Sequence, residues 1–317
     1  MAVYMSPKQI GFCGQYEVEV ESPVVSQILQ KTLTSYSNDR ITSVGIAAFA
    51  HCSQLTDISL PNVTTIGSSA FDYCSHLVNL NLSNVTSIGS YAFRSCYSLI
   101  TVNFSKVTSV GEYVFNYCSQ LINISFPLLS SIGSYMFTSC RALQNAIFPN
   151  ITYIGYEAFW GCTNLNNISF PNASMISTYA FEHCYALVNI NFPSVTTVGQ
   201  YAFYNCSSLT NVSLPLASSI GTSAFRNCSS LSQLSLPKVT WIGNNAFYAC
   251  YNLISLNLSG ISSIPILSGS SAFNSTPIGG YSTSAGQFGS VYVPASLYND
   301  FLTAANWSSI SNRIVSI

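Results

Sequence analysis

The stretch NVTSIGSYAFRSCYSL at residues 84–99 returns 22 residues later, almost unchanged, as KVTSVGEYVFNYCSQL at residues 106–121. A glycine, a phenylalanine and a cysteine keep their places in both copies. The phenylalanines and cysteines recur with this period ten times: Phe49, Phe71, Phe93, Phe115, Phe137, Phe159, Phe181, Phe203, Phe225 and Phe247, and Cys52, Cys74, Cys96, Cys118, Cys140, Cys162, Cys184, Cys206, Cys228 and Cys250. A unit of this length cannot enclose its own apolar face, so it must stack on its neighbours. The period therefore predicts a solenoid.

Within one coil, LTDISLP at residues 55–61 places Ile58 and Leu60 at alternate positions, which predicts a strand with one buried face. The segment VTTIG at residues 63–67 predicts a second, shorter extended segment that ends in a bend at its glycine. The segment SSAFDYC at residues 68–74 predicts one helical or 3-10 turn, which returns the chain to the next strand.

The consensus L-x-x-I-x-L-P-x-V-T-x-I-G-x-x-A-F-x-x-C resembles the BspA-like class of leucine-rich repeats over residues 41–264. The stretch VYVPASLYNDFLTAANWSSISNRIVSI at residues 291–317 is similar to the closing segment of many bacterial members. The resemblance implies a mostly β leucine-rich repeat solenoid of about ten to eleven coils with parallel strands. It also implies a surface-exposed or secreted adhesion and recognition module, usually bacterial, without enzyme activity.

Three regions are expected along the chain. Residues 1–40 predict an N-terminal cap made of a strand and a short helix, and residues 41–264 predict the repeats. The period fails after Phe247, since Phe273 follows 26 residues later. Residues 265–317 therefore predict an irregular last coil and a C-terminal cap. Caps have a physical purpose, because exposed edges of parallel strands invite aggregation.

The repeat cysteines allow more than one interpretation. Coils stacked about 4.8 Å apart bring equivalent cysteines within bridging range, but their Cα–Cβ vectors run parallel rather than converging. The sequence contains no CxxC pair or Cys/His cluster suited to zinc. We expect buried free thiols that fill space where the turn meets the core, with disulfides and a metal site as the alternatives.

Composition argues against several function classes. Only 6% of the residues are charged and the net charge is −1, so no basic surface for binding nucleic acid is expected. Ser, Thr and Asn interrupt every apolar run, so no membrane insertion is expected. The first residues show no secretory signal peptide. The resemblance favours the cell surface or secretion, and a cytoplasmic location is the alternative. Three histidines and ten scattered acids suggest neither a catalytic site, a metal site nor a cofactor.

Two outward surfaces are candidates for binding. The strand face is densest in amides at the middle coils, where we expect ligand contacts at Asn123, Asn145, Ile147, Asn167, Asn189 and Asn191. An aromatic edge at Tyr91, Tyr113 and Tyr135 is the alternative site. Both sets also have a purely structural interpretation, as hydrogen-bonded amide ladders and as stacked rings.

These surfaces predict a monomeric, non-enzymatic recognition and adhesion module. The expected partner is a protein or a glycan on a host or neighbouring cell. The competing hypothesis is a structural spacer or scaffold with no ligand of its own.

Overall fold

The structure is a computed structural model, and it describes residues 32–317. The chain forms two compact units: unit 1 ends at Phe148, and unit 2 runs from Pro149 to Ile317. Each unit is described separately. The strand expected at residues 16–20 and most of the helix expected after Pro23 lie outside the described residues.

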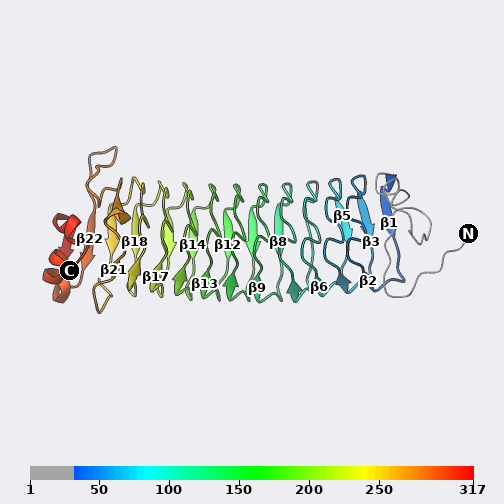
Figure 1. The fold of residues 1–317 in the computed structure, drawn as a ribbon, viewed down its shortest axis with the longest axis horizontal. Coiled ribbons are helices and arrows are strands. Elements are labelled where there is room, and N and C mark those ends of the chain that lie inside the picture. Colours follow the sequence, from blue (N-terminus) through cyan, green and yellow to red (C-terminus); the bar gives the residue numbers. More distant parts are fainter. Residues whose placement is uncertain (1–31) are drawn as a thin grey trace, which may run out of the picture. The chain divides into compact units, whose positions relative to one another are not determined.

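The coils of unit 1 carry a long and a short strand on different sides, except that one coil has only an isolated bridge at Thr101 in place of its long strand (Figure 1). The long strands are β1 (Ser35–Ser37), β3 (Asp57–Ser59), β5 (Asn79–Asn81), β8 (Asn123–Ser125) and β10 (Asn145–Ile147). The short strands are β2 (Ser43–Val44), β4 (Thr65–Ile66), β6 (Ser87–Ile88), β7 (Ser109–Val110) and β9 (Ser131–Ile132). Neighbouring strands pair in parallel with a register of one repeat, for example Asp57 with Asn79.

Unit 2 repeats this plan. Its long strands are β12 (Asn167–Ser169), β14 (Asn189–Asn191), β16 (Asn211–Ser213), β18 (Gln233–Ser235), β20 (Ser255–Asn257), β22 (Ser290–Val293) and β23 (Ile314–Ser316). The short strands are β11 (Tyr153–Ile154), β13 (Met175–Ile176), β15 (Thr197–Val198), β17 (Ser219–Ile220), β19 (Trp241–Ile242) and β21 (Ile266–Leu267). The strands from β14 to β23 form one parallel sheet, and those from β11 to β21 belong to another.

The predicted fold class is confirmed: the protein is mostly β, with parallel strands stacked in a solenoid. The two units together contain about 13 turns, slightly more than the ten to eleven expected. The additional turns lie outside the strict period. Strand β1 pairs with β3 ahead of the first full repeat, and β22 and β23 continue the parallel ladder after the period fails.

Stacked phenylalanine rings form the core of each unit. In unit 1 the rings from Phe49 to Phe137 stack with centroids 5.2–5.7 Å apart. In unit 2 the rings from Phe159 to Phe273 stack at 5.2–5.8 Å. All of these rings are buried. The fixed period of phenylalanine follows from this packing, because each ring covers the face of the next one.

The return segment of the repeat is not the helical or 3-10 turn that the sequence suggested. It contains two left-handed residues per coil, for example Tyr91 at φ 62° and Ser95 at φ 58°. Alternate N–H groups donate to the next coil, since Tyr91 N bonds Glu112 O at 2.9 Å and Ser95 N bonds Asn116 O at 2.8 Å. Each left-handed residue costs roughly 1–2 kcal/mol, which these bonds between coils offset.

The glycine column is needed for close packing between coils. A Cβ atom at Gly89 would lie 2.5 Å from Ser68 N, and one at Gly221 would lie 2.5 Å from the carbonyl carbon of Gly199. Neither glycine has a left-handed φ. The bend expected at this position is therefore permitted by the missing side chain rather than by unusual backbone angles.

The ten repeat cysteines are free and buried, as predicted. The structure adds a role that the sequence did not suggest. The thiol of Cys206 donates to the Phe181 carbonyl of the preceding coil at 3.2 Å, and Cys96 makes the same bond to Phe71. Burial raises the pKa of the Cys250 thiol to about 12. These thiols are therefore poor nucleophiles near neutral pH.

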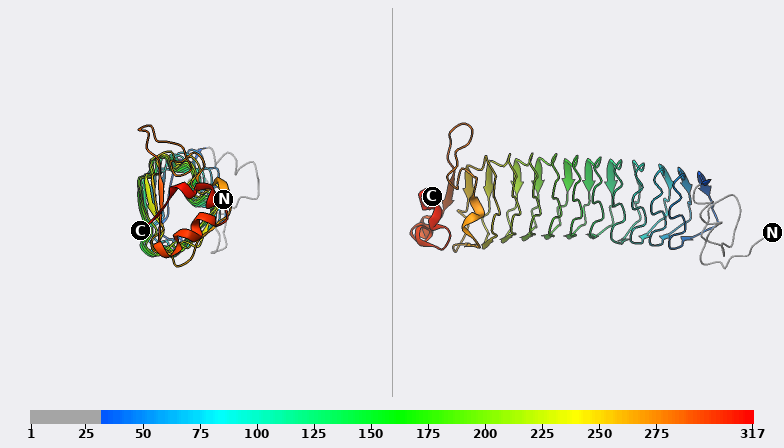
Figure 2. Two further views of the ribbon diagram at one scale, coloured as in Figure 1. Left: turned by 90° about the vertical axis from the view of Figure 1, so that its left-hand side faces the viewer. Right: turned by 45° about the horizontal axis from the view of Figure 1, so that its top comes forward.

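The C-terminal segment packs over the last coils of unit 2 (red in Figure 2). Its helical elements are η1 (Ser270–Phe273), η2 (Ala295–Leu297), α2 (Tyr298–Thr303) and η3 (Ser308–Arg313). The buried Trp307 ring lies against Phe273 and Phe301, and its indole N–H donates to Pro265 O at 2.8 Å. The loop between η1 and β22 projects beyond the neighbouring coils (brown in Figure 2).

Candidate functional site

The long strands turn their first and third residues toward solvent, and their second residues are buried or half-buried. We call the two resulting surfaces the long-strand faces of unit 1 and unit 2. In unit 1 the predicted residues Asn123 and Asn145 pair in register, and Asn145 Nδ2 donates to Asn123 Oδ1 at 2.6 Å. Ile147 follows on the same strand with 44% of its surface exposed.

In unit 2 the predicted Asn189 and Asn191 lie on β14, and Asn167 lies exposed on β12. The side chains of β14 line a groove of about 500 Å³ that continues across β16, β18 and β20. We call this hollow the amide groove. Its polar lining residues are Asn189, Asn191, Thr210, Asn211, Ser213, Gln233, Ser235, Ser255 and Asn257.

The prediction selected strands by their density of asparagine, and it therefore left out most of the amide groove. Gln233, Ser235 and Asn257 occupy the same outward repeat positions as the predicted residues. The column pattern was visible in the sequence. The position of the hollow on this face was not, because it depends on how successive coils are placed.

Unit 1 has a comparable hollow of about 500 Å³ at its other long strands, β1, β3 and β5. Here the amides bond to neighbouring side chains. Asn79 Nδ2 donates to Asp57 Oδ1 at 2.6 Å, and Asn81 Nδ2 donates to Ser59 Oγ at 3.1 Å. Hydrogen bonds from Thr56 and Asn79 lower the pKa of Asp57. This hollow contains a carboxylate, whereas the amide groove has no charged lining residue.

The alternative aromatic edge lies on the return segments of unit 1. The rings of Tyr91 and Tyr113 stack at 4.7 Å, and those of Tyr113 and Tyr135 stack at 4.2 Å. Desolvation raises the pKa of Tyr113 to about 12. Because these rings cover one another, the row mainly presents edges and hydroxyl groups rather than open faces for a sugar.

An internal arginine occupies part of the same edge. The Arg94 guanidinium lies 5.0 Å from the Tyr91 ring centroid and 5.1 Å from that of Tyr73. Its Nε and Nη2 atoms donate to the two carboxylate oxygens of Asp72 at 2.8 and 2.6 Å. The hydrogen bonds to Asp72 are the main cause of the raised pKa of Arg94. The ion pair and the rings therefore satisfy this cation within the protein.

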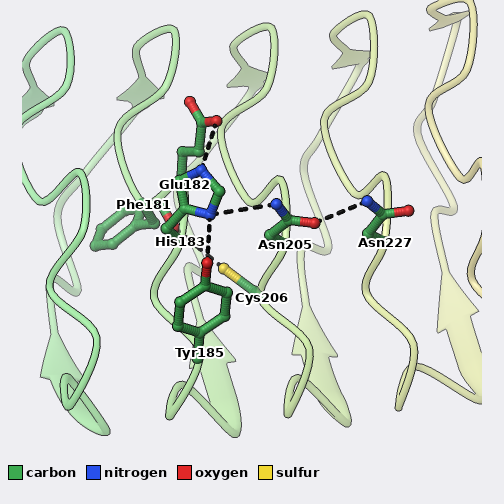
Figure 3. A network of polar contacts seen from close by, with 7 residues as sticks. All are labelled: Phe181, Glu182, His183, Tyr185, Asn205, Cys206 and Asn227. Atoms are coloured by element: carbon green, nitrogen blue, oxygen red, sulfur yellow. Dashed lines mark hydrogen bonds and ion pairs between the residues drawn. The ribbon is translucent and has the colours of Figure 1, made fainter.

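The return segments of unit 2 carry a titratable network (Figure 3). Glu182 Oε1 lies 3.2 Å from His183 Nε2, while His183 Nδ1 lies 2.8 Å from the Tyr185 hydroxyl and 3.2 Å from Asn205 Nδ2. An amide nitrogen can only donate, so Nδ1 accepts and the ring proton is on Nε2, facing Glu182. Burial raises the pKa of Glu182 to about 7 and lowers that of His183.

Between residues 32 and 317, no group of three or more His, Cys, Asp or Glu side chains is placed to hold a metal ion. The helices in that part of the chain are also too short or too polar to cross a membrane. What the long-strand faces offer chemically is hydrogen bonding by neutral amides and hydroxyl groups.

Comparison with known proteins gave one family and several similar folds. The family model described as the BspA type leucine rich repeat region matches residues 42–166, 104–207, 130–254 and 196–282. A leucine-rich repeat protein from Bacteroides ovatus is 24% identical with a TM-score of 0.55, and the match covers 90% of this chain and 84% of that one.

Two further structures are similar to parts or most of the chain. A leucine rich cell surface protein from Faecalibacterium prausnitzii is 22% identical with a TM-score of 0.41, covering 88% of this chain and 92% of that one. A leucine rich repeat protein from T. pallidum is 30% identical with a TM-score of 0.44, covering 46% and 72%. No curated protein matches the sequence.

Proposed function

Because the chain belongs to the BspA-type leucine-rich repeat family, we propose that it is a recognition and adhesion module that binds a protein or a glycan on a host or neighbouring cell. Leucine-rich repeat proteins are typically interaction or surface modules and typically lack enzyme activity. The observation that carries the proposal is the long-strand face, which is lined mainly by neutral hydrogen-bonding side chains and is hollowed in each unit.

Binding on this face would use several weak contacts together. A single polar contact contributes only about 0.5–1.5 kcal/mol, so a partner must span several coils. We place contacts at the predicted residues, with Asn123, Asn145 and Ile147 in unit 1 and Asn167, Asn189 and Asn191 in unit 2. Ile147 supplies an exposed apolar side chain in an otherwise polar column.

The test is an array of glycans and surface proteins probed with the full chain and two double variants. One is Asn145→Ala with Ile147→Asp, and the other is Asn189→Ala with Asn191→Ala. At least one variant should weaken binding tenfold or more, equivalent to about 1.4 kcal/mol. A control, Ser109→Ala on the short strand β7, should bind like the parent. A ligand whose binding neither double variant weakens would exclude the predicted contacts on β10 and β14 as its site.

A structural spacer is the second candidate function. The amide pairs Asn145–Asn123 and Asn211–Asn189 favour it, because such pairs satisfy one another without a ligand. Under this alternative the array gives no specific ligand, and both double variants remain folded. The same array therefore separates the two functions.

We also propose a location at the cell surface or outside the cell, with the cytoplasm as the alternative. Proteins of the BspA type are typically bacterial surface proteins. Brief protease treatment of intact cells should remove the protein if it is exposed. Survival of the full chain in intact cells, with cleavage only after lysis, would contradict surface display. Light scattering tests the expected monomer.

A further inference from the structure

The amide groove borders the place where the repeat is interrupted. After η1, the residues up to β22 form a loop that departs from the 22-residue period (Figure 2). This loop exposes Tyr281 by 61% and Phe288 by 51%. It borders β18 and β20 through a second hollow of about 410 Å³, lined by Ser232 and Ile254 and by Thr283 and Gln287 of the loop. Insertions in repeat proteins often mark the binding face.

The amide groove also keeps its hydrogen-bonding groups available. Among the residues that the structure describes, the side chains of Asn191, Ser213, Gln233, Ser235 and Ser255 make no hydrogen bond to one another or to the rest of the chain. The hollow of unit 1 differs, because Asn79 and Asn81 are already paired. Available donors and acceptors favour an external partner rich in hydroxyl or amide groups.

The backbone of the strands that line the amide groove is not available for pairing with a ligand. Each of β16, β18 and β20 pairs with a parallel strand on both sides. An extended peptide that binds by adding a strand needs a free sheet edge, which this part of the face lacks. Recognition must therefore depend on the side chains.

An aromatic ring stands at the end of the groove. On β22 the residues Val291 and Val293 are buried, while Tyr292 between them is partly exposed and in register with Asn257. A sugar ring has hydroxyl groups around its rim, which pair with amides, and an apolar face, which packs on an aromatic ring. With no charged residue lining the groove, an uncharged sugar matches it better than an acidic one.

We propose that the amide groove binds a neutral oligosaccharide, with the sugar hydroxyl groups on Asn191, Gln233 and Ser235 and one sugar face on Tyr292. This inference rests on the recognition function proposed above and names its ligand class. The loop after η1 lines a separate hollow beside the residues that precede β18 and β20.

The experiment is calorimetric titration of the full chain with soluble maltohexaose, cellohexaose, xylohexaose and mannohexaose, each to about 1 mM. Hexagalacturonate serves as the acidic comparison. We expect one neutral hexasaccharide to bind more tightly than hexagalacturonate. Gln233→Ala with Ser235→Ala, at the outward positions of β18, should weaken the binding of that hexasaccharide at least tenfold. The matched pair Asn79→Ala with Asn81→Ala, on the other long-strand face, should leave affinity within twofold. Tyr292→Ala should weaken binding and Tyr292→Phe should restore it.

Other results overturn the inference in distinguishable ways. Tighter binding of hexagalacturonate would refute the neutral ligand class. Binding of a neutral hexasaccharide that is unaffected by the groove variants would refute the site. If no hexasaccharide binds but a protein from the surface array does, the oligosaccharide inference fails and the recognition function stands. If neither the array nor the titration gives a ligand, both the oligosaccharide inference and the proposed recognition function fail.

Discussion

The two long-strand faces come from the same repeat but use their polar side chains differently. In unit 1 the amides of β5 donate to Asp57 and Ser59 on the neighbouring strand β3. In unit 2 Asn211 donates to Asn189 in the same way, but Gln233 and Ser235 on β18 make no such bond within the described chain. The repeat thus fixes which residues face outward, while small differences of residue type decide whether they bond to each other or remain available.

The two units should not differ in their cores. Substitutions in the core are expected to have the largest effect, which is on the free energy of unfolding. Phe93 and Phe181 are both buried between two stacked rings. Replacing either with alanine should lower the free energy of unfolding by about 3–5 kcal/mol, because each change leaves a cavity that the neighbouring coils cannot fill. Urea denaturation of both variants measures this. A cost below about 1 kcal/mol at one site would show that its ring stack is not equivalent to the other.

The cysteine column offers a second matched pair. The thiols of Cys96 and Cys206 each donate to a phenylalanine carbonyl at 3.2 Å. Cys96→Ala and Cys206→Ala should each cost about 1–2 kcal/mol, from the lost sulfur contacts and the lost weak hydrogen bond. Denaturation curves for the two variants should shift equally. A variant as stable as the parent would contradict a structural role for that thiol.

The return segments of unit 2 predict a pH-dependent effect. Burial raises the pKa of Glu182 to about 7, so the folded protein retains a proton that the unfolded chain has lost. This group therefore favours folding at acidic pH, and its contribution is lost as pH rises from about 4.5 to about 7. Glu182→Gln should stabilise the protein at pH 8 by about 1 kcal/mol, a value reduced because solvent reaches the carboxylate.

Thermal unfolding at pH 5 and pH 8 measures this difference. The gain from Glu182→Gln should shrink at pH 5, where the parent's Glu182 is itself protonated. His183, whose pKa is lowered by burial, acts in the opposite direction and is common to both proteins. Glu112→Gln, at an exposed residue of unit 1, is the control for the loss of one carboxylate from the surface. An equal gain at both pH values would contradict the raised pKa.

The smallest effect concerns the amide pairs themselves. Asn79 Nδ2 is one of two donors that lower the pKa of Asp57. Asn79→Ala should raise that pKa toward its ordinary value, since one stabilising hydrogen bond to the carboxylate is lost. Carbon-detected NMR titration of Asp57 measures it. Gln233→Ala, at the equivalent position of unit 2, should leave Asp57 unchanged. An unaltered Asp57 titration in the Asn79→Ala protein would show that the pair does not form.

Much of the fold could be predicted because it depends on which residue types recur at each position of the 22-residue repeat. The phenylalanine, cysteine and glycine columns follow from stacking, and the outward residues of the long strands follow from alternation. The prediction of a helical or 3-10 turn for the return segment was wrong, because nothing in SSAFDYC indicates that alternate N–H groups bond to the next coil. Positions such as Tyr91 adopt left-handed angles only because those bonds compensate for them.

The candidate site was less predictable for a different reason. Asn189 and Asn191 were correctly placed on the outward face, but Gln233 and Ser255 line the same groove and were not selected. The number of asparagines in a stretch of sequence does not indicate which side chains bond to each other. It also does not report that the loop after η1 lies beside β18 and β20, since that contact depends on the folded backbone.

Side-chain amide NMR distinguishes available amides from paired ones on the two long-strand faces. The chain, labelled with nitrogen-15, is titrated with the hexasaccharide that binds in calorimetry or, failing one, with the protein selected on the array. We expect shifts of the side-chain amide signals of Asn191 and Gln233, with those of Asn79 and Asn81 unchanged. Shifts confined to Asn79 and Asn81, or equal shifts on both faces, would contradict it.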